Sequence, residues 1–458
     1  MSVLDTHSIE GAEKDDPSTT RSSTVINEKT VDVSLKGVDS NEQEDVEVAG
    51  ETTSEFTFPE GGWRAWSTVF GGFLVQFACF GYISSFGVYQ DFYVRQYLRN
   101  YSTSQIGWIG GVQVFLNFAP GIIAGRLFDR GYFRHLIITS VIIYAVSMFS
   151  LSLAHENSYY QIFLTNGVGL GLSSGLTYAS CLALPGHYFR RRRAIAVGIV
   201  SSGSAIGGIF HPILVNKLIN GPVGFHNAVR ISASMNVALL ILAACLMRTR
   251  LPPKPKAQNF PVMKWLKEPT YLPLVLSGIP CFIGLFFPPF YIQLNAISHG
   301  VDRKFAFYTI AILNAGSYVG RILPALLSRK LGVFNLGTIN TMLAGVVCIT
   351  LIWVKDAGAT VAYALIFGVL SGTCIALTPA MFAQVTKDPT EFGTRFGIYL
   401  GLGGLVGLFA TPILGALLTS HFHWVPPSLL AGFALIATGL CYGASRFFFV
   451  RQQGTHLV

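Results

Sequence analysis

Residues 188–214 decide the fold of this chain, and they read YFRRRRAIAVGIVSSGSAIGGIFHPIL. Four consecutive arginines, residues 190–193, end abruptly at a long apolar segment that contains no acidic residue. An arginine at the centre of a bilayer costs at least about 2.5–3.5 kcal/mol, and positive charge is retained on the cytoplasmic side. The stretch is therefore interpreted as a cytoplasmic loop that enters a membrane-spanning helix. Gly203 and Gly207 form a face of small residues on which a second helix can pack closely.

The same pattern recurs 200 residues later, which predicts a duplicated architecture. Gly203, Gly207 and the Pro-Ile-Leu of residues 212–214 are matched by Gly403, Gly407 and the Pro-Ile-Leu of residues 412–414. Repeats of this kind build secondary transporters, in which a central site opens alternately to the two sides of the membrane.

The composition is that of a polytopic membrane protein. The 458 residues are 51% hydrophobic and 12% charged, with a mean hydropathy of +0.50. Residues 1–57 differ, because they hold fourteen acidic and four basic residues and no aromatic residue before Phe56. They are predicted to form a disordered acidic cytoplasmic tail, without a cleaved signal peptide.

Twelve apolar segments have roughly the 20 residues that a helix needs to cross a bilayer. They are placed at residues 64–88, 105–126, 135–154, 159–184, 194–218, 229–247, 270–295, 305–327, 333–354, 359–384, 395–419 and 425–449. The predicted fold is an all-α membrane protein with twelve transmembrane helices in two six-helix pseudo-repeat halves. These halves are residues 58–247 and 269–450, joined by a cytoplasmic linker at 248–268 and followed by a short cytoplasmic tail at 451–458.

Loop charges orient the chain in the bilayer. Loops predicted to lie inside hold seventeen Lys and Arg residues, and loops predicted to lie outside hold seven. Positive loops stay in the cytoplasm, so both termini are expected there. An N-glycosylation sequon, Asn100-Tyr101-Ser102, falls in the first external loop and makes Asn100 a candidate glycosylation site.

A charged motif, GRLFDRGYFR, stands at residues 125–134 between spans 2 and 3. Its Asp129, with Arg130 and Arg134, can pair with neighbouring charges and with a helix terminus. Together with Gly125 these residues form a candidate conformational latch that breaks when the halves rock. The motif resembles the GxxxDRxGxR signature of the major facilitator superfamily, with Gly131 one position early.

Within that superfamily the chain resembles the fungal branch of the monocarboxylate porter family. The resemblance rests on EGGWRAW at residues 60–66, YFRRRRAIAVG at 188–198 and EFGTRFG at 391–397. It implies transport or symport of a small organic anion by alternating access. Classical animal members use an Asp and an Arg one turn apart in span 8 and a Lys in span 1. Arg321 matches that Arg, whereas Ser317 and Ser84 stand at the other two positions, which puts the classical proton coupling in doubt.

The candidate substrate-binding residues lie mainly in span 8. Asn314, Ser317, Tyr318 and Arg321 follow one another at i, i+3, i+4 and i+7, so they share a helical face. The guanidinium of Arg321 offers a planar donor fork to an anion. Two interpretations of Arg321 remain open, since it could instead extend to the cytoplasm along the helix.

Polar side chains in other spans are weaker candidates. Gln113 and Asn117 in span 2, and Tyr82 in span 1, can contact a ligand or serve as packing contacts between helices. His211 is expected to be a packing residue. No metal-ligand spacing or enzyme motif is present, so neither an enzyme nor a cofactor is expected.

The leading functional hypothesis is a secondary active or facilitative transporter of a small organic anion. The alternatives are an exporter of a secondary metabolite, a riboflavin-like carrier or a non-transporting nutrient sensor. The expected partners are a small-molecule substrate, anionic in view of Arg321, and the lipid bilayer, without nucleic acid. We expect a monomer in the plasma membrane, with the vacuolar membrane as the alternative.

Overall fold

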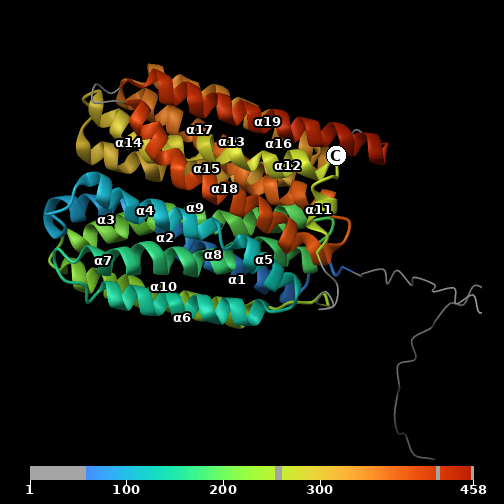
Figure 1. Cartoon of the computed structure of the whole chain (residues 1–458), viewed down its shortest axis with the longest axis horizontal. Coiled ribbons are helices and arrows are strands. Elements are labelled where there is room, and N and C mark those ends of the chain that lie inside the picture. The colour runs from blue at the N-terminus through green and yellow to red at the C-terminus, as the bar shows by residue number, and fades with distance from the viewer. Residues whose placement is uncertain (1–57, 253–259, 419–422, 455–458) are drawn as a thin grey trace, which may run out of the picture. The chain divides into compact units, whose positions relative to one another are not determined.

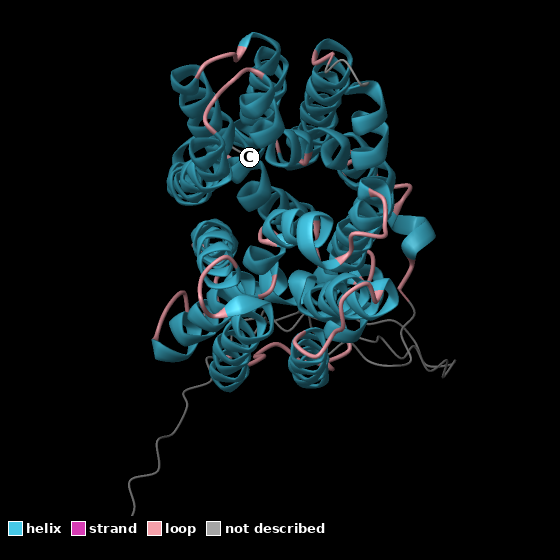
Figure 2. Cartoon of the chain, turned by 90° about the vertical axis from the view of Figure 1, so that its left-hand side faces the viewer, coloured by secondary structure: helices cyan, strands magenta, loops and turns pink. Residues whose placement is uncertain are grey.

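A computed structural model describes residues 58–252, 260–418 and 423–454, and all regular structure in these ranges is helical (Figure 2). Twelve segments in these ranges are long and apolar enough to cross a membrane. These spans 1 to 12 are Trp63–Tyr97, Gln105–Asp129, Phe133–Leu151, Tyr159–His187, Arg193–Ile219, Gly224–Leu246, Tyr271–Ser298, Arg303–Ser328, Val333–Trp353, Ala357–Val385, Pro389–Leu418 and Val425–Gln452. The predicted twelve-span, all-α fold is confirmed. The predicted tail at 1–57, part of the linker and the last four residues lie outside the described ranges.

The first half contains spans 1 to 6 and is drawn in blue to green in Figure 1. Several of its spans are interrupted helices. Its elements are α1 (Trp63–Ala78), α2 (Phe80–Ile83), α3 (Phe86–Phe92), η1 (Tyr93–Tyr97), α4 (Thr103–Phe118), α5 (Gly121–Asp129), α6 (Phe133–Leu151), α7 (Tyr159–Ile162), η2 (Phe163–Gly169), α8 (Leu170–Ala183), η3 (Leu184–His187), α9 (Arg193–Ile219) and α10 (Gly224–Leu246).

The second half contains spans 7 to 12 and is drawn in yellow to red in Figure 1. The short helix α11 (Val262–Trp265) precedes it. Its elements are α12 (Tyr271–Leu276), α13 (Gly278–Leu285), α14 (Phe287–Ser298), α15 (Arg303–Leu331), α16 (Val333–Ile349), η4 (Thr350–Trp353), α17 (Ala357–Val385), η5 (Pro389–Glu391), α18 (Phe392–Leu418) and α19 (Val425–Gln453).

Span 2 shows how the sequence sets these helix boundaries. Ser102 caps α4 by accepting a hydrogen bond from the Gln105 N–H, while the Gln105 side chain accepts one from the Ser102 N–H. This reciprocal capping box satisfies amide groups that a helix start would leave unpaired. Pro120 separates α4 from α5, because proline lacks the N–H that would continue the helical ladder.

The predicted small-residue face of span 5 packs against span 1. A Cβ added to Gly203 would lie 3.2 Å from Phe73 Cα, and one added to Gly81 of α2 would lie 2.6 Å from Gly207 Cα. The matching Gly403 of span 11 faces Phe282 of span 7, where an added Cβ would lie 2.5 Å from Cδ2. Spans 5 and 11 therefore use equivalent glycines against spans 1 and 7, as the duplicated pattern predicts.

Candidate functional site

A cavity of about 230 Å³ is lined by residues of both halves. Spans 1, 2 and 4 contribute from the first half, and spans 7, 8, 10 and 11 from the second. The wall is largely apolar and contains several aromatic side chains, which include Phe80, Phe118, Tyr178, Phe282, Phe286 and Tyr399. The rings of Phe118 and Phe282 meet edge to face across the two halves, with centroids 4.8 Å apart. Such a wall favours flat, apolar ligand surfaces.

Arg321 of α15 places a positively charged guanidinium in the lining of this cavity. Its side chain is only 3% exposed, and its Nε donates to Ser317 Oγ at 3.2 Å. Its Nη1 donates to the Ser201 carbonyl oxygen and to Ser204 Oγ, both on α9 of the first half. No Asp or Glu among the described residues pairs with it. Arg321 therefore joins the two halves and retains an uncompensated positive charge.

A glycine allows α9 and α15 to meet at this level. A Cβ added to Gly198 would lie 2.6 Å from the Arg321 carbonyl oxygen and 3.0 Å from Ala325 Cβ. These distances leave no room for a larger residue. The backbones of spans 5 and 8 therefore touch where the Arg321 side chain crosses between them.

Five of the predicted binding residues line the cavity. Asn314, Ser317 and Arg321 come from span 8, and Gln113 and Asn117 come from span 2. Asn314 is held by Nδ2 donating to the Ile310 carbonyl at 3.0 Å and the Gly208 carbonyl at 3.4 Å.

Tyr318 is not among the described lining residues, and its side chain is 37% exposed. The expectation that Tyr318 belongs to the binding site is therefore corrected, although it lies only about 60° from Arg321 around the helix. At about 100° per residue, the lining positions of α15 cover one side of the helix, and position 318 falls beyond its edge.

Tyr82 also lies elsewhere, in the interior of the first half. It is 2% exposed and hydrogen-bonds to Tyr89, and its ring centroid lies 5.2 Å from that of His211. His211 Nε2 contacts the Phe77 carbonyl oxygen at 3.1 Å. Both residues connect α9 to span 1, so Tyr82 leaves the set of substrate contacts and His211 has the packing position expected of it.

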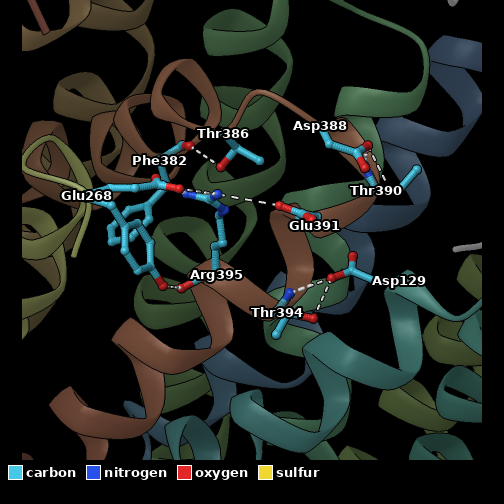
Figure 3. A network of polar contacts seen from close by, with 10 residues as sticks. Asp129, Glu268, Phe382, Thr386, Asp388, Thr390, Glu391, Thr394 and Arg395 are labelled. Atoms are coloured by element: carbon cyan, nitrogen blue, oxygen red, sulfur yellow. Dashed lines mark hydrogen bonds and ion pairs between the residues drawn. The ribbon is translucent and has the colours of Figure 1, made fainter. Parts of the chain in front are cut away.

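Asp129 of the candidate latch contacts the other half directly (Figure 3). Its carboxylate accepts hydrogen bonds from the Gly393 N–H at 3.0 Å, the Thr394 N–H at 2.6 Å and the Thr394 hydroxyl at 2.7 Å. These donors lie at the start of α18, where free N–H groups and the helix dipole favour an anion. Asp129 therefore joins the two halves at this end of the molecule. This end is named here the arginine-rich end, after the four arginines of residues 190–193.

Gly125 makes the latch contact possible. A Cβ at this position would lie 2.6 Å from the Gly393 carbonyl carbon and 3.2 Å from Thr394 N. Conversely, a Cβ on Gly393 would lie 2.6 Å from Asp129 Oδ1. The two glycines let α5 and α18 touch, which brings the Asp129 carboxylate to the helix start.

Arg130 and Arg134, the two arginines of the candidate latch, have other partners. Arg130 lies over the ring of Phe260 in the linker, at 5.7 Å from the centroid, and Arg134 donates to the Ala244 carbonyl oxygen at 2.8 Å. Arg134 therefore fastens α6 to the end of α10 within the first half.

A second charged cluster stands beside the latch (Figure 3). Arg395 of α18 makes a bidentate pair with Glu268, at 2.7 and 3.0 Å, and contacts Glu391 at 3.4 Å. Its guanidinium lies 4.6 Å from the centre of the Trp265 ring. The cluster ties the linker to the same helix start that receives Asp129.

The two family-like motifs at residues 60–66 and 188–198 meet at this end. The Glu60 carboxylate accepts hydrogen bonds from three consecutive backbone N–H groups, those of Arg190 at 2.7 Å, Arg191 at 2.5 Å and Arg192 at 3.1 Å. Burial raises the pKa of Glu60, but these donors and the charge of Arg191 outweigh it and hold the pKa below 4.5. The ring of Trp66 packs on Phe189 at 5.0 Å.

Sequence reasoning missed the Arg395–Glu268 pair, the Glu60 contact and the aromatic wall. One signal for the pair is that Glu268 is the sole acidic residue of the linker at 248–268. The aromatic residues gave no such signal, because Phe, Tyr or Trp occurs in each of the twelve spans, whether or not the span lines the cavity. Asn100 is exposed in the loop between spans 1 and 2, as a glycosylation site would be.

Comparison with known proteins identifies the family. Residues 68–399 match the Major Facilitator Superfamily. The chain is 35% identical over 396 residues to the aspyridones efflux protein apdF of Emericella nidulans, covering 86% of this chain and 80% of that protein. It is 34% identical over 377 residues to the agnestins efflux protein AgnL12 of Paecilomyces divaricatus, with coverages of 81% and 85%.

Solved structures share the fold at low sequence identity. The human organic anion transporter MFSD10 superposes with a TM-score of 0.63 at 13% identity, covering 83% of this chain and 99% of its own. The E. coli fucose:proton symporter FucP gives a TM-score of 0.62 at 17% identity, with coverages of 82% and 98%. The related fungal proteins are named efflux proteins or transporters rather than monocarboxylate porters, so the narrower resemblance is not supported. The chain is an integral membrane transporter that belongs to the Major Facilitator Superfamily.

Proposed function

We propose that the protein exports an amphiphilic, anionic secondary metabolite and that Arg321 binds its anionic group. The observation that carries the proposal is a buried guanidinium in a largely apolar cavity with several aromatic side chains, without an acidic partner among the described residues. Intramembrane charges are costly and mark substrate or ion sites. A guanidinium also fits the planar, delocalised charge of a carboxylate or enolate.

The cavity wall supports a larger substrate than a simple monocarboxylate. A short aliphatic acid would occupy Arg321 and leave the rings of Phe118, Tyr178 and Phe282 without a partner. A substrate with an aromatic surface would bury them as well, which adds hydrophobic free energy to the charge contact. The efflux function named for two of the relatives supports export as the direction.

Arg321 also offers a way to couple binding to conformational change. Its Nη1 holds Ser201 and Ser204 of the other half in the state described here. A substrate anion competes with these oxygens for the N–H donors of Arg321. Binding thereby weakens one contact between the halves, and such differential contact is what shifts a conformational equilibrium.

We place the arginine-rich end in the cytoplasm, because positive loops are retained there. With Asp129 bonded to α18, the cytoplasmic end is closed, and the cavity lining reaches Gln90 and Gln293 near the opposite end. In the export cycle, substrate enters after the Asp129 contact opens and leaves once it closes. We propose the plasma membrane as the location, with cytoplasmic termini.

The proposal does not include proton symport. Among the described residues that line the cavity, none is Asp, Glu or His. The lining therefore supplies no carboxylate or imidazole that could carry a proton with the substrate.

Comparative metabolomics tests the proposed function. Cells with and without the protein are grown in parallel, and medium and cell extracts are analysed by mass spectrometry. In cells that lack the protein, we expect the concentration of acidic aromatic metabolites to be lower in the medium and higher inside the cells. Arg321→Gln should reproduce this loss, whereas Arg99→Gln, in an exposed loop, should match the wild type. If only neutral or cationic metabolites change when the protein is absent, the proposal of an anionic substrate is contradicted. If metabolites accumulate inside cells that express the protein, the proposal of export is contradicted.

A further inference from the structure

The first-half wall of the cavity carries two amide side chains one helical turn apart, Gln113 and Asn117 of α4. Gln113 is 2% exposed and Asn117 is 1% exposed, and both line the cavity. Neither amide atom of Asn117 has a hydrogen-bond partner among the described residues, and Gln113 Oε1 has none either. Buried amides are normally paired, so three unpaired atoms at one site require an explanation.

Both residues line the cavity on one side of α4. On another side of α4, α8 lies so close that a Cβ added to Gly171 would be 2.8 Å from the Gln113 carbonyl oxygen. That side is therefore filled by the packing of the two helices. Asn314 provides the contrast, because its Nδ2 is bonded to two backbone carbonyl groups in the same cavity. Asn117 lacks such partners among the described residues.

We infer that Asn117 binds a lactam or other cis-amide edge of the substrate, on which an N–H and a C=O lie side by side. The inference rests on the proposed function of the cavity, in which Arg321 holds the anionic group of the same substrate. A side-chain amide presents one acceptor oxygen and an NH₂ donor in a single plane, which is complementary to a cis-amide edge. Gln113 Oε1 supplies a further acceptor one turn away. The substrate class is therefore a planar aromatic acid that carries a lactam.

Four probes separate the two polar contacts. The first, 2-quinolone-4-carboxylate, has an aromatic ring, a lactam and an anion. Its N-methyl derivative lacks the lactam donor, quinoline-4-carboxylate lacks the lactam, and 2-quinolone lacks the anion. Binding of each probe to the purified full-length protein in nanodiscs is measured by isothermal titration calorimetry.

In the wild type we expect 2-quinolone-4-carboxylate to bind roughly tenfold or more tightly than its N-methyl derivative, because that derivative leaves a buried acceptor unpaired. Asn117→Leu should bring this ratio close to one. Asn295→Leu is the matched control, since the Asn295 amide is also buried and unpaired among the described residues but is not part of the cavity lining. It should leave the ratio unchanged.

Thermal unfolding of the unliganded variants checks that the fold is retained. Removing an unpaired amide should leave the melting temperature of Asn117→Leu no lower than that of the wild type. A lower melting temperature would mean that the amide is paired within the protein and would overturn the inference.

The remaining outcomes distinguish this inference from the proposed function. A lactam preference that is absent from the wild type, or that persists in Asn117→Leu, overturns the lactam site while leaving the anion site standing. A carboxylate preference that is absent, or that persists in Arg321→Gln, overturns the proposed function. Failure of all four probes to bind at millimolar concentration overturns both.

Discussion

Replacing Asp129 with Asn should open the arginine-rich end of the protein. The Asp129 carboxylate is 4% exposed and accepts three hydrogen bonds from the start of α18. Asparagine keeps one acceptor oxygen and turns an NH₂ group toward the remaining donors, so at least one charge-assisted bond is lost. Such a bond contributes about 1.5–3 kcal/mol. The ratio of closed to open protein at this end should therefore fall by roughly tenfold to more than a hundredfold.

Electron–electron double resonance measures this change. Spin labels are placed at His135→Cys in the first half and Lys387→Cys in the second, two exposed positions, in a background in which Cys245 and Cys441 are replaced with Ser. The wild type should show mainly the short distance, and Asp129→Asn should show a larger long-distance population.

Asp388→Asn is the matched control for this measurement. The Asp388 carboxylate also accepts hydrogen bonds, from the N–H and the hydroxyl of Thr390, but both donors lie two residues away in η5 of the same half. Its substitution should leave the distance distribution unchanged. The latch would be refuted by identical distributions for the wild type and Asp129→Asn, or by an equal shift in Asp388→Asn.

Three further predictions concern the Gly125 contact, the Glu60 contact and the orientation in the membrane. Gly125→Ala should push α5 from Gly393 and increase the long-distance population in the same resonance experiment, and an unchanged distribution would contradict the close approach. Glu60 has a pKa lowered by folding, so its contribution to stability is present above the unfolded value of 4.5 and is lost as the pH falls through the lower folded value. Melting temperatures should fall less with acidification in Glu60→Gln than in the wild type, and equal pH profiles would argue against this contact. Single cysteines at Lys264 and Arg99, both exposed, should react with an impermeant reagent from the cytoplasm and from outside respectively, and the reverse pattern would overturn the orientation.

Much of the architecture could be predicted because the membrane imposes a strong rule. A span needs a long apolar segment, and arginines such as residues 190–193 cannot enter it, so the number and order of spans follow from composition. Breaks within spans were harder to predict. Pro120 interrupts span 2 at a residue that the apolar pattern passes over, since proline is apolar yet lacks an N–H.

The candidate site was predicted in part, for reasons of helix geometry and sequence distance. Arg321 was found because a charge within a span is rare, and its turn neighbour Ser317 followed from the helical period. Tyr318 was misplaced because the face formed by residues 314, 317, 318 and 321 is rotated by about 40° from the strip of α15 that lines the cavity. The Asp129–Thr394 contact joins residues 265 positions apart, and no local pattern specifies which helix start the carboxylate meets.

Transport by Arg321 variants tests the central claim most directly. The acidic metabolite that the comparative metabolomics identifies is added to the outside of inside-out vesicles, and initial rates of uptake are compared at equal protein levels. Arg321→Lys should retain partial transport, because it keeps the charge but loses the planar donor fork. Arg321→Gln should lower the affinity roughly tenfold to more than a hundredfold, the effect of losing one charged hydrogen bond. Wild-type rates and affinity in Arg321→Gln would contradict the account, because the anion would then be recognised elsewhere.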